Sequence, residues 1–140
     1  MEIITKNAEE TFRLGEKIGS DLIRLSAGTQ TIALSGDLGS GKTVFVQGLA
    51  KGLGIKNRIQ SPTFILMRRY GSFYHLDLYR LENNVERQVE ELGLFDIWKQ
   101  KNNIVAIEWA EKVKSILPKE TIFINFENVN ENERKITITE

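Results

Sequence analysis

The sequence contains no cysteine, only two prolines and a single histidine among its 140 residues. Without cysteine the chain has no disulfide, no cysteine-ligated zinc and no thiol nucleophile, so these three kinds of chemistry are excluded. Its 19 basic and 19 acidic residues give a formal net charge of zero. It therefore lacks the global positive field that attracts nucleic acid by phosphate neutralisation, and we expect any RNA contact to run through a partner or a local patch.

Long apolar segments are also missing from the sequence. No apolar run reaches the roughly 18 residues that indicate a membrane-spanning helix, and no basic-then-apolar leader follows Met1. We therefore expect no membrane span, no secretion signal and a cytoplasmic location. The length suits a single domain, residues 1–140, that buries its core without disulfides.

The most informative segment is Gly36–Thr43, which reads GDLGSGKT and matches the phosphate-binding pattern G-x-x-x-x-G-K-[ST]. An apolar run of strand length, residues 31–35, precedes it, and apolar residues at helical spacing follow it from residue 46 to 53. Glycines let successive backbone N–H groups turn toward one point, and a helix N-terminus adds the positive end of its dipole. The expected occupant is a nucleoside triphosphate, with Lys42 at the β- and γ-phosphates and the Thr43 hydroxyl on Mg²⁺.

Strand and helix patterns alternate along the rest of the chain. Strands are predicted at Glu2–Thr5, Thr31–Ser35, Phe64–Tyr70, Phe73–Tyr79, Ile104–Ile107, Thr121–Glu127 and Lys135–Thr139, and helices at Ala8–Leu25, after the phosphate loop, around Val85–Leu92, at Leu94–Gln100 and at Ala110–Leu117. The alternation indicates parallel strands covered on both faces, while hairpins at residues 71–72 and 128–134 add antiparallel strands. We predict an α/β fold, a P-loop NTPase three-layer sandwich with a mixed central sheet flanked by helices.

A triphosphate site also needs a carboxylate near the metal, and the sequence offers two. Glu108 follows the continuous apolar run Ile104–Ile107, which is typical of a strand buried on both faces beside the phosphate-loop strand. Asp77 shares one strand face with His75 and Tyr79, which we interpret as a half-exposed polar face. We therefore expect Glu108 on the magnesium side and Asp77 in water positioning. The alternatives are a surface acid for Glu108 and a salt-bridged strand residue for Asp77.

Three further residues are each open to more than one interpretation. Thr63 follows Pro62 in a turn, where its hydroxyl could sense the γ-phosphate or metal, or simply open a strand. Trp109 could stack on the base, flank the phosphates or pack in the core. We interpret His75, the only histidine, as structural or partner-facing rather than catalytic.

Three motifs accompany the phosphate loop: SPTF at residues 61–64, HLDLYR at 75–80 and IEWAE at 107–111. In this order and spacing, and over nearly its whole length, the chain closely resembles the bacterial TsaE (formerly YjeE) ATPases of the tRNA threonylcarbamoyladenosine pathway. The resemblance implies a small ATPase that uses ATP and Mg²⁺ and acts with the TsaB and TsaD proteins on adenosine 37 of tRNA. It also implies that ATP hydrolysis resets that complex between turnovers, and that the chain contacts tRNA only indirectly, through the complex.

The resemblance also implies residue roles. Lys42 would serve the phosphates, Thr43 and Glu108 the magnesium ion, and Thr63 and Asp77 a switch or the attacking water. Thr11 and Arg134 match positions on the base side of the nucleotide. The residues expected to contact the nucleotide are Thr11, Gly36, Asp37, Leu38, Gly39, Ser40, Gly41, Lys42, Thr43, Val44, Thr63, Trp109 and Arg134. Among these, Val44 stands where many members carry a second threonine that is not a required ligand.

Other functions use the same loop. A small-molecule kinase would need an acceptor pocket and an arginine-bearing lid, for which 140 residues leave little room. A GTP-dependent switch would need a base-reading Asn-Lys-x-Asp, which the sequence lacks. A non-enzymatic nucleotide sensor would share every residue above and stays open. Because no arginine is obviously placed as an arginine finger, and Arg80 and Arg134 are no more than candidates, we expect a slow ATPase that a partner completes or that acts as a switch.

Overall fold

The computed structural model describes residues 1–24, 28–37, 39–59 and 66–140. In chain order the elements are β1 (Glu2–Thr5), α1 (Ala8–Arg24), β2 (Gln30–Gly36), α2 (Lys42–Gly52), β3 (Met67–Tyr70), β4 (Phe73–Asp77), α3 (Val85–Glu91), α4 (Leu94–Lys99), β5 (Ile104–Glu108), the 3₁₀ helix η1 (Ala110–Ile116), β6 (Ile122–Asn128) and β7 (Arg134–Thr139). None of the helices in these ranges is long and apolar enough to cross a membrane.

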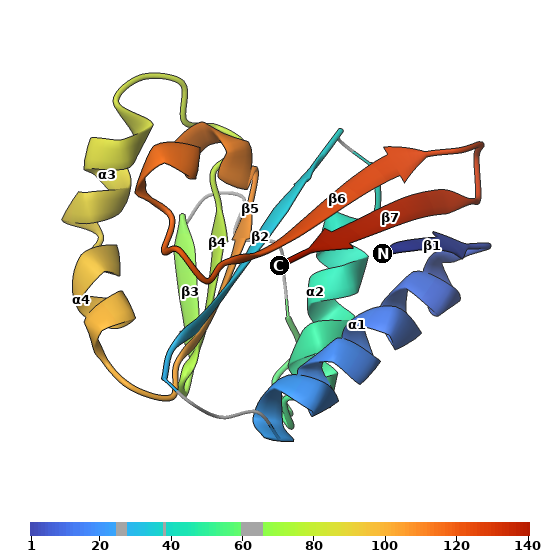
Figure 1. Ribbon diagram of the computed structural model, residues 1–140, viewed down its shortest axis with the longest axis horizontal. Helices are drawn as coiled ribbons and strands as arrows, with labels where there is room; N and C mark the ends of the chain where they lie inside the picture. Colours follow the sequence, from blue (N-terminus) through green and yellow to red (C-terminus); the bar gives the residue numbers. More distant parts are fainter. Residues whose placement is uncertain (25–27, 38, 60–65) are drawn as a thin grey trace.

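The seven strands form one mixed sheet in the order β1-β7-β6-β2-β5-β4-β3. The central strands β6, β2, β5 and β4 are parallel, whereas the pairs β1/β7, β6/β7 and β3/β4 are antiparallel. The predicted mixed sheet is thus confirmed, including both hairpins. The strand before the phosphate loop, β2, lies at the centre between β6 and β5 (Figure 1). All four parallel strands therefore end at the same edge, where ligands bind in α/β sheets.

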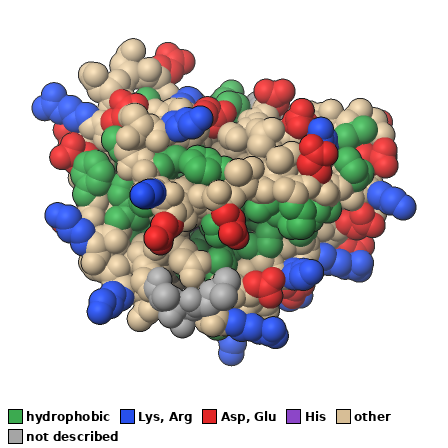
Figure 2. Space-filling model, viewed as in Figure 1, with side chains coloured by type: hydrophobic (Ala, Val, Ile, Leu, Met, Phe, Trp, Pro, Cys, Tyr) green, Lys and Arg blue, Asp and Glu red, His purple; other side chains and the backbone are tan. Residues whose placement is uncertain are grey.

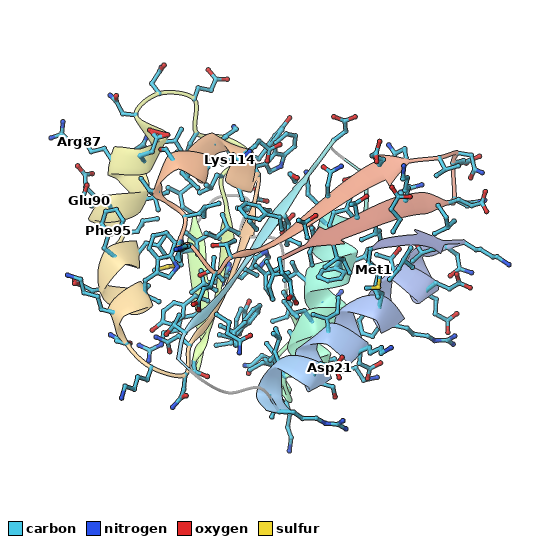
Figure 3. The ribbon with its side chains drawn as sticks, viewed as in Figure 1. Met1, Asp21, Arg87, Glu90, Phe95 and Lys114 are labelled. Atoms are coloured by element: carbon cyan, nitrogen blue, oxygen red, sulfur yellow. The ribbon has the colours of Figure 1, made fainter. Side chains whose placement is uncertain are left out.

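Helices cover both faces of the sheet, with α1 and α2 on one side and α3, α4 and η1 on the other (Figure 1). Alternate residues of β2 face opposite layers: Ile32 and Leu34 pack with Phe45 of α2, and Ala33 packs with the other layer. Figure 3 shows side chains between the sheet and each of its two helical layers, while the exposed Asp21 projects outward from α1. These observations confirm the three-layer sandwich.

The structure corrects the prediction that β4 has a half-exposed polar face. His75 has 0% of its surface exposed, and Tyr74 on the opposite face is also buried. The reason is that β4 lies beside the central strand β5, so both of its faces are covered: Phe73 packs in the α2 cluster and Tyr74 in the α3, α4 and η1 cluster. Only Asp77, at the end of the strand, is partly exposed.

Several predicted boundaries shift by a few residues. β4 ends at Asp77 rather than Tyr79, and β3 begins at Met67, while residues 64–65 of the predicted strand lie outside the described residues. The predicted helix after Glu108 is a 3₁₀ helix interrupted by non-helical backbone at Val113. A helical apolar spacing does not distinguish three from 3.6 residues per turn over seven residues.

Helices α1 and α2 pack backbone to backbone through four glycines. A Cβ atom built on Gly15 or Gly19 of α1 would lie 2.2 or 2.3 Å from a carbonyl oxygen of α2. A Cβ atom on Gly48 or Gly52 of α2 would lie 2.0 Å from a carbonyl oxygen of α1. The contact fixes α1 against the helix that begins at the phosphate loop, and only hydrogen fits at these positions.

Candidate nucleotide-binding site

The Gly36–Thr43 loop connects the central strand β2 to helix α2, as its sequence predicts. Gly41 has φ 99°, a left-handed conformation that suits glycine, and α2 begins at the next residue. Gly36 has no room for a side chain, because a Cβ atom there would lie 2.5 Å from the carbonyl oxygen of Phe126. The buried Ser40 Oγ has no hydrogen-bond partner among the described residues. The first N–H groups of a helix have no partner within the helix, so those at the start of α2, together with this hydroxyl, fit the oxygens of a polyphosphate.

Lys42 is held across the start of the loop. Its Nζ donates to the carbonyl oxygens of Gly36 and, at 3.5 Å, of Asp37, and lies 3.7 Å from the centre of the Trp109 ring. The residue is only 4% exposed. Burial lowers the pKa of Lys42 from its usual 10.5, and nearby carboxylates, Glu108 above all, act in the opposite direction. The Lys42 ammonium therefore lies at the phosphate loop, close to the Glu108 carboxylate.

This lowered pKa predicts a pH-dependent stability. Because the folded protein binds the Lys42 proton less tightly than the unfolded chain, Lys42 destabilises the fold below its folded-state pKa. That penalty is relieved as the pH rises through the folded-state pKa toward 10.5. Urea unfolding of wild type and Lys42→Met between pH 7 and pH 10 should show the stability of wild type rising relative to the variant. A constant or falling difference would contradict the assignment.

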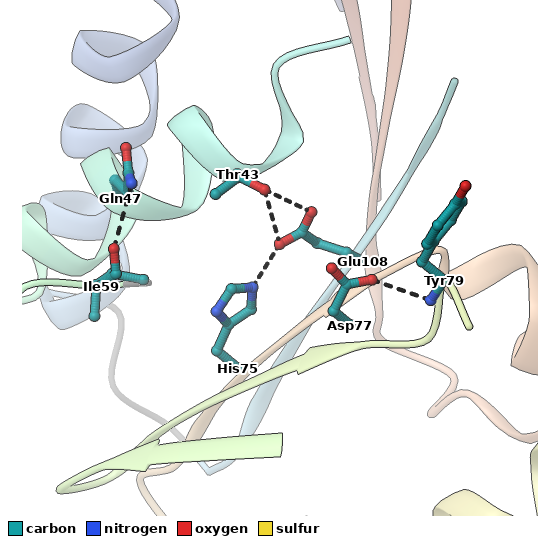
Figure 4. Close-up of polar contacts among 7 residues, drawn as sticks. All are labelled: Thr43, Gln47, Ile59, His75, Asp77, Tyr79 and Glu108. Atoms are coloured by element: carbon teal, nitrogen blue, oxygen red, sulfur yellow. Dashed lines mark hydrogen bonds and ion pairs between the residues drawn. The ribbon is translucent and has the colours of Figure 1, made fainter. Parts of the chain in front are cut away.

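Thr43 and Glu108 meet at the carboxyl edge of the sheet. The Thr43 hydroxyl donates to Glu108 Oε1 at 3.1 Å, and Oε2 lies 3.5 Å away (Figure 4). Glu108 ends β5 and pairs in register with Leu34 of β2 and Asp77 of β4, which explains why the carboxylate reaches the start of α2. A hydroxyl and a carboxylate are the hard oxygen donors that Mg²⁺ prefers.

The described residues contain no group of three or more histidine, cysteine or acidic side chains placed to hold a metal ion. This agrees with the donor set just described, because Mg²⁺ at nucleotide sites takes one or two protein oxygens and completes its shell with phosphates and water. The site therefore fits a metal that arrives with a nucleotide, and does not fit an all-protein metal cage.

Asp77 lies beside Glu108 and is oriented by its own chain. Its Oδ1 accepts a hydrogen bond of 3.0 Å from the backbone N–H of Tyr79. The segment that follows is fastened to η1 by Lys112, whose Nζ donates to the carbonyl oxygens of Leu78, Tyr79 and Leu81 at 3.1, 2.8 and 2.7 Å. The two candidate carboxylates are thus held close to each other from neighbouring strands.

Trp109 follows Glu108 with a backbone φ of 60°, which is rare for a bulky side chain. Its ring lies against the Lys42 ammonium and 5.2 Å from the ring of Tyr79. Among the interpretations from the sequence, the position beside Lys42 favours a ring that flanks the phosphates, a role that stays a prediction. Trp109 also packs at the edge of the core beneath η1.

The remaining predicted contacts fall into three groups. Thr11 is buried, shares a hydrogen bond of 2.7 Å with Thr5, and packs near Gly41. Arg134 donates to the Gly39 carbonyl oxygen at 3.3 Å and to three carbonyl oxygens of the β6–β7 turn.

The other predicted contacts differ in exposure. Val44 is half-buried in α2, and Asp37 and Gly39 are exposed on the loop, whereas Leu38 and Thr63 lie outside the described residues. The base-side roles of Thr11 and Arg134 stay predictions.

Two residues at the site, His75 and Lys112, were not predicted from the sequence to act there. His75 Nε2 lies 2.6 Å from Glu108 Oε2, so the histidine interpreted as structural or partner-facing contacts the magnesium-side carboxylate. The available signal was that His75 and Asp77 share one face of a strand that ends beside Glu108. For Lys112, no pattern in the sequence indicates a bond to carbonyl oxygens about thirty residues earlier.

Comparison with known proteins shows which protein family the chain resembles. Residues 5–136 match the family described as threonylcarbamoyl adenosine biosynthesis protein TsaE. The tRNA threonylcarbamoyladenosine biosynthesis protein TsaE of Treponema pallidum is 37% identical over 145 residues, covering 99% of both chains. The Aquifex aeolicus protein of the same name is 36% identical over 143 residues, covering 98% of this chain and 94% of the relative.

The fold agrees with a solved structure as well. The crystal structure of Bacillus subtilis YdiB superposes with a TM-score of 0.74 at 27% sequence identity, covering 99% of this chain and 83% of that one. The match therefore includes the strand, loop and helix that form the site. By its sequence along nearly the whole length and by its fold, the chain belongs to the TsaE family of threonylcarbamoyl adenosine biosynthesis proteins.

Proposed function

We propose that this chain binds ATP with Mg²⁺ at the Gly36–Thr43 loop and hydrolyses it slowly, in the service of threonylcarbamoyladenosine formation in tRNA. The observation that carries the proposal is the 3.1 Å contact between Thr43 Oγ1 and Glu108 Oε1 beside Lys42. It brings the hydroxyl, carboxylate and ammonium that a magnesium triphosphate needs to one loop. The names of the relatives, tRNA threonylcarbamoyladenosine biosynthesis proteins, support the biological role.

Each residue has a chemical task in this proposal. Thr43 and Glu108 would hold Mg²⁺, which when bound supplies positive charge to the β- and γ-phosphate oxygens. The first N–H groups of α2 and the Ser40 hydroxyl would bind phosphate oxygens. Lys42 would leave the carbonyl oxygens that it contacts and place its ammonium on the β- and γ-phosphates.

Hydrolysis requires a water molecule in line with the γ-phosphate. The water oxygen bonds to the γ-phosphorus while the bond to the β–γ bridging oxygen breaks, which yields ADP and inorganic phosphate. Asp77 would orient that water, a role supported by its partial exposure and its register beside Glu108. Lys42 stabilises the charge that develops on the phosphate oxygens, an effect enlarged by its burial.

The proposal includes a partner, the TsaB and TsaD pair. Arg134 supports it, because its guanidinium is engaged by backbone carbonyl oxygens of the β6–β7 turn and of Gly39. A charge that stabilises the transition state would then come from outside the chain. Acidic and basic side chains are interspersed over the face seen in Figure 2, in keeping with an indirect role toward tRNA.

The test is an equilibrium titration of ATP, with and without Mg²⁺, against wild type and Glu108→Ala. Loss of the carboxylate should weaken ATP binding in the presence of Mg²⁺ by about tenfold or more and change metal-free binding little. The exposed Glu120→Ala serves as the matched control. Mg²⁺ dependence unchanged in Glu108→Ala would move the carboxylate role to Asp77, and competition by GTP as effective as ATP would favour a guanine-nucleotide switch.

A further inference from the structure

His75 is a fully buried polar residue directly beneath the site. It lies in the middle of β4, opposite Ala106 of β5, with 0% of its surface exposed. Its Nε2 is 2.6 Å from Glu108 Oε2, and the Phe73 ring stacks beside it with centres 6.5 Å apart. The ring is therefore fixed by the sheet and the core, and Figure 4 shows it pointing at the Glu108 carboxylate.

The hydrogen bond has a defined direction. A carboxylate that binds Mg²⁺ is ionised and can only accept, so in the proposed metal site the Nε2 hydrogen of His75 is donated to Glu108. The other ring nitrogen, Nδ1, is buried and has no partner among the described residues. Among the described residues, no second hydrogen bond therefore competes with Glu108 for the orientation of the packed ring.

Glu108 is consequently held from two sides. Thr43 donates to the carboxylate from the first turn of α2, at 3.1 Å from Oε1, and His75 donates to Oε2 from β4. Glu108 is 2% exposed, so few water molecules can donate hydrogen bonds to either carboxylate oxygen in place of Thr43 and His75. Without His75, the carboxylate would lose its only described partner on Oε2 other than the Thr43 hydroxyl at 3.5 Å and could rotate about its side-chain bonds.

We propose that His75 is a positioning residue, which holds the Glu108 carboxylate in the orientation that presents it to Mg²⁺ beside Thr43. The inference rests on the proposed function, because it assigns His75 to the same metal site. Hydrogen bonds from outside a metal's ligand shell fix the orientation of its carboxylate ligands, and their loss costs about 10- to 100-fold in metal affinity. In this role His75 itself would contact neither metal nor nucleotide.

The first measurement needs no nucleotide. Because His75 is the only histidine in the chain, histidine-labelled protein gives one imidazole in a ¹H–¹⁵N NMR spectrum. We expect a hydrogen on Nε2 that exchanges slowly with water, and faster exchange in Glu108→Ala. A hydrogen on Nδ1 instead, or exchange unaffected by Glu108→Ala, would overturn the hydrogen bond on which the inference depends.

The second measurement compares His75→Phe, which keeps the ring and its packing but removes the donor, with His75→Gln, which returns an N–H near the Nε2 position. His75→Phe should raise the Mg²⁺ concentration that half-saturates ATP binding by about tenfold or more, leave metal-free ATP binding within about twofold, and be rescued by His75→Gln. Equal Mg²⁺ dependence in His75→Phe and wild type, or weakening without regard to Mg²⁺, would overturn the inference alone. Wild type that binds ATP without any Mg²⁺ dependence would overturn the proposed function as well.

Discussion

Replacing Lys42 by alanine should lower the rate of ATP hydrolysis by about 10²- to 10³-fold, the range that follows loss of one preorganised charge-stabilising donor. Lys42 is the ammonium that lies at the phosphate loop, bonded to the Gly36 carbonyl oxygen and covered by the Trp109 ring. Water cannot easily replace it, because the residue is 4% exposed. Both nucleotide affinity and turnover should therefore fall.

The control for this prediction comes from the same helix. Lys51 lies in the last turn of α2 and is exposed. It forms a surface ion pair with Glu16 at 3.7 Å and lies 5.7 Å from the centre of the Phe12 ring, away from the phosphate loop, so Lys51→Ala should hydrolyse ATP like wild type. Circular dichroism and thermal unfolding of both variants show whether the fold is intact. Hydrolysis by Lys42→Ala at the wild-type rate would show that the phosphate loop takes no part in the reaction.

Gly48→Ala should lower the free energy of unfolding by about 3 kcal/mol, although alanine favours a helix over glycine by about 1 kcal/mol. The added methyl group would lie 2.0 Å from the carbonyl oxygen of Phe12 and 3.1 Å from the backbone nitrogen of Glu16. Neither is the end of a flexible side chain, so α1 and α2 must separate. Separation also opens the core in which Phe45 and Leu49 pack with α1.

The control for Gly48→Ala is an alanine substitution at an exposed position of the other helix. Ser20→Ala, at an exposed position on α1 beside Gly19, introduces the same residue where no backbone opposes it and should be neutral or slightly stabilising. Urea unfolding of the two variants measures both changes. Gly48→Ala as stable as wild type would show that the helices can separate at no cost, and would contradict the close packing.

The sequence was sufficient for the parts of the fold that depend on short-range patterns. The Gly36–Thr43 loop predicted its own strand and helix, and the uninterrupted apolar run before Glu108 predicted a central strand beside it. The structure confirms both, since β5 pairs with β2 and Glu108 contacts Thr43. The reason is that phosphate-loop glycines and continuous apolar runs are each restrictive about the backbone or burial that they require.

Features that depend on tertiary contacts were not predictable in the same way. The burial of His75 follows from β4 lying between β5 and β3 under two helical layers, a position that its alternating pattern does not reveal. The bonds of Lys112 to carbonyl oxygens, and the contact between Arg134 and Gly39, join segments far apart in the chain. Side chains of this kind have no local signal, because their partners are brought together only by the complete sheet.

A partner-gated ATPase is tested by Mg²⁺-dependent phosphate release from ATP by the purified chain, alone and with the cognate TsaB and TsaD pair, with Lys42→Ala as the blank. We expect slow release by the chain alone, a large stimulation by the pair, and loss of both in the blank. Brisk release without partners, or none with them, would contradict a partner-gated ATPase and would point instead to a kinase acceptor or a nucleotide sensor.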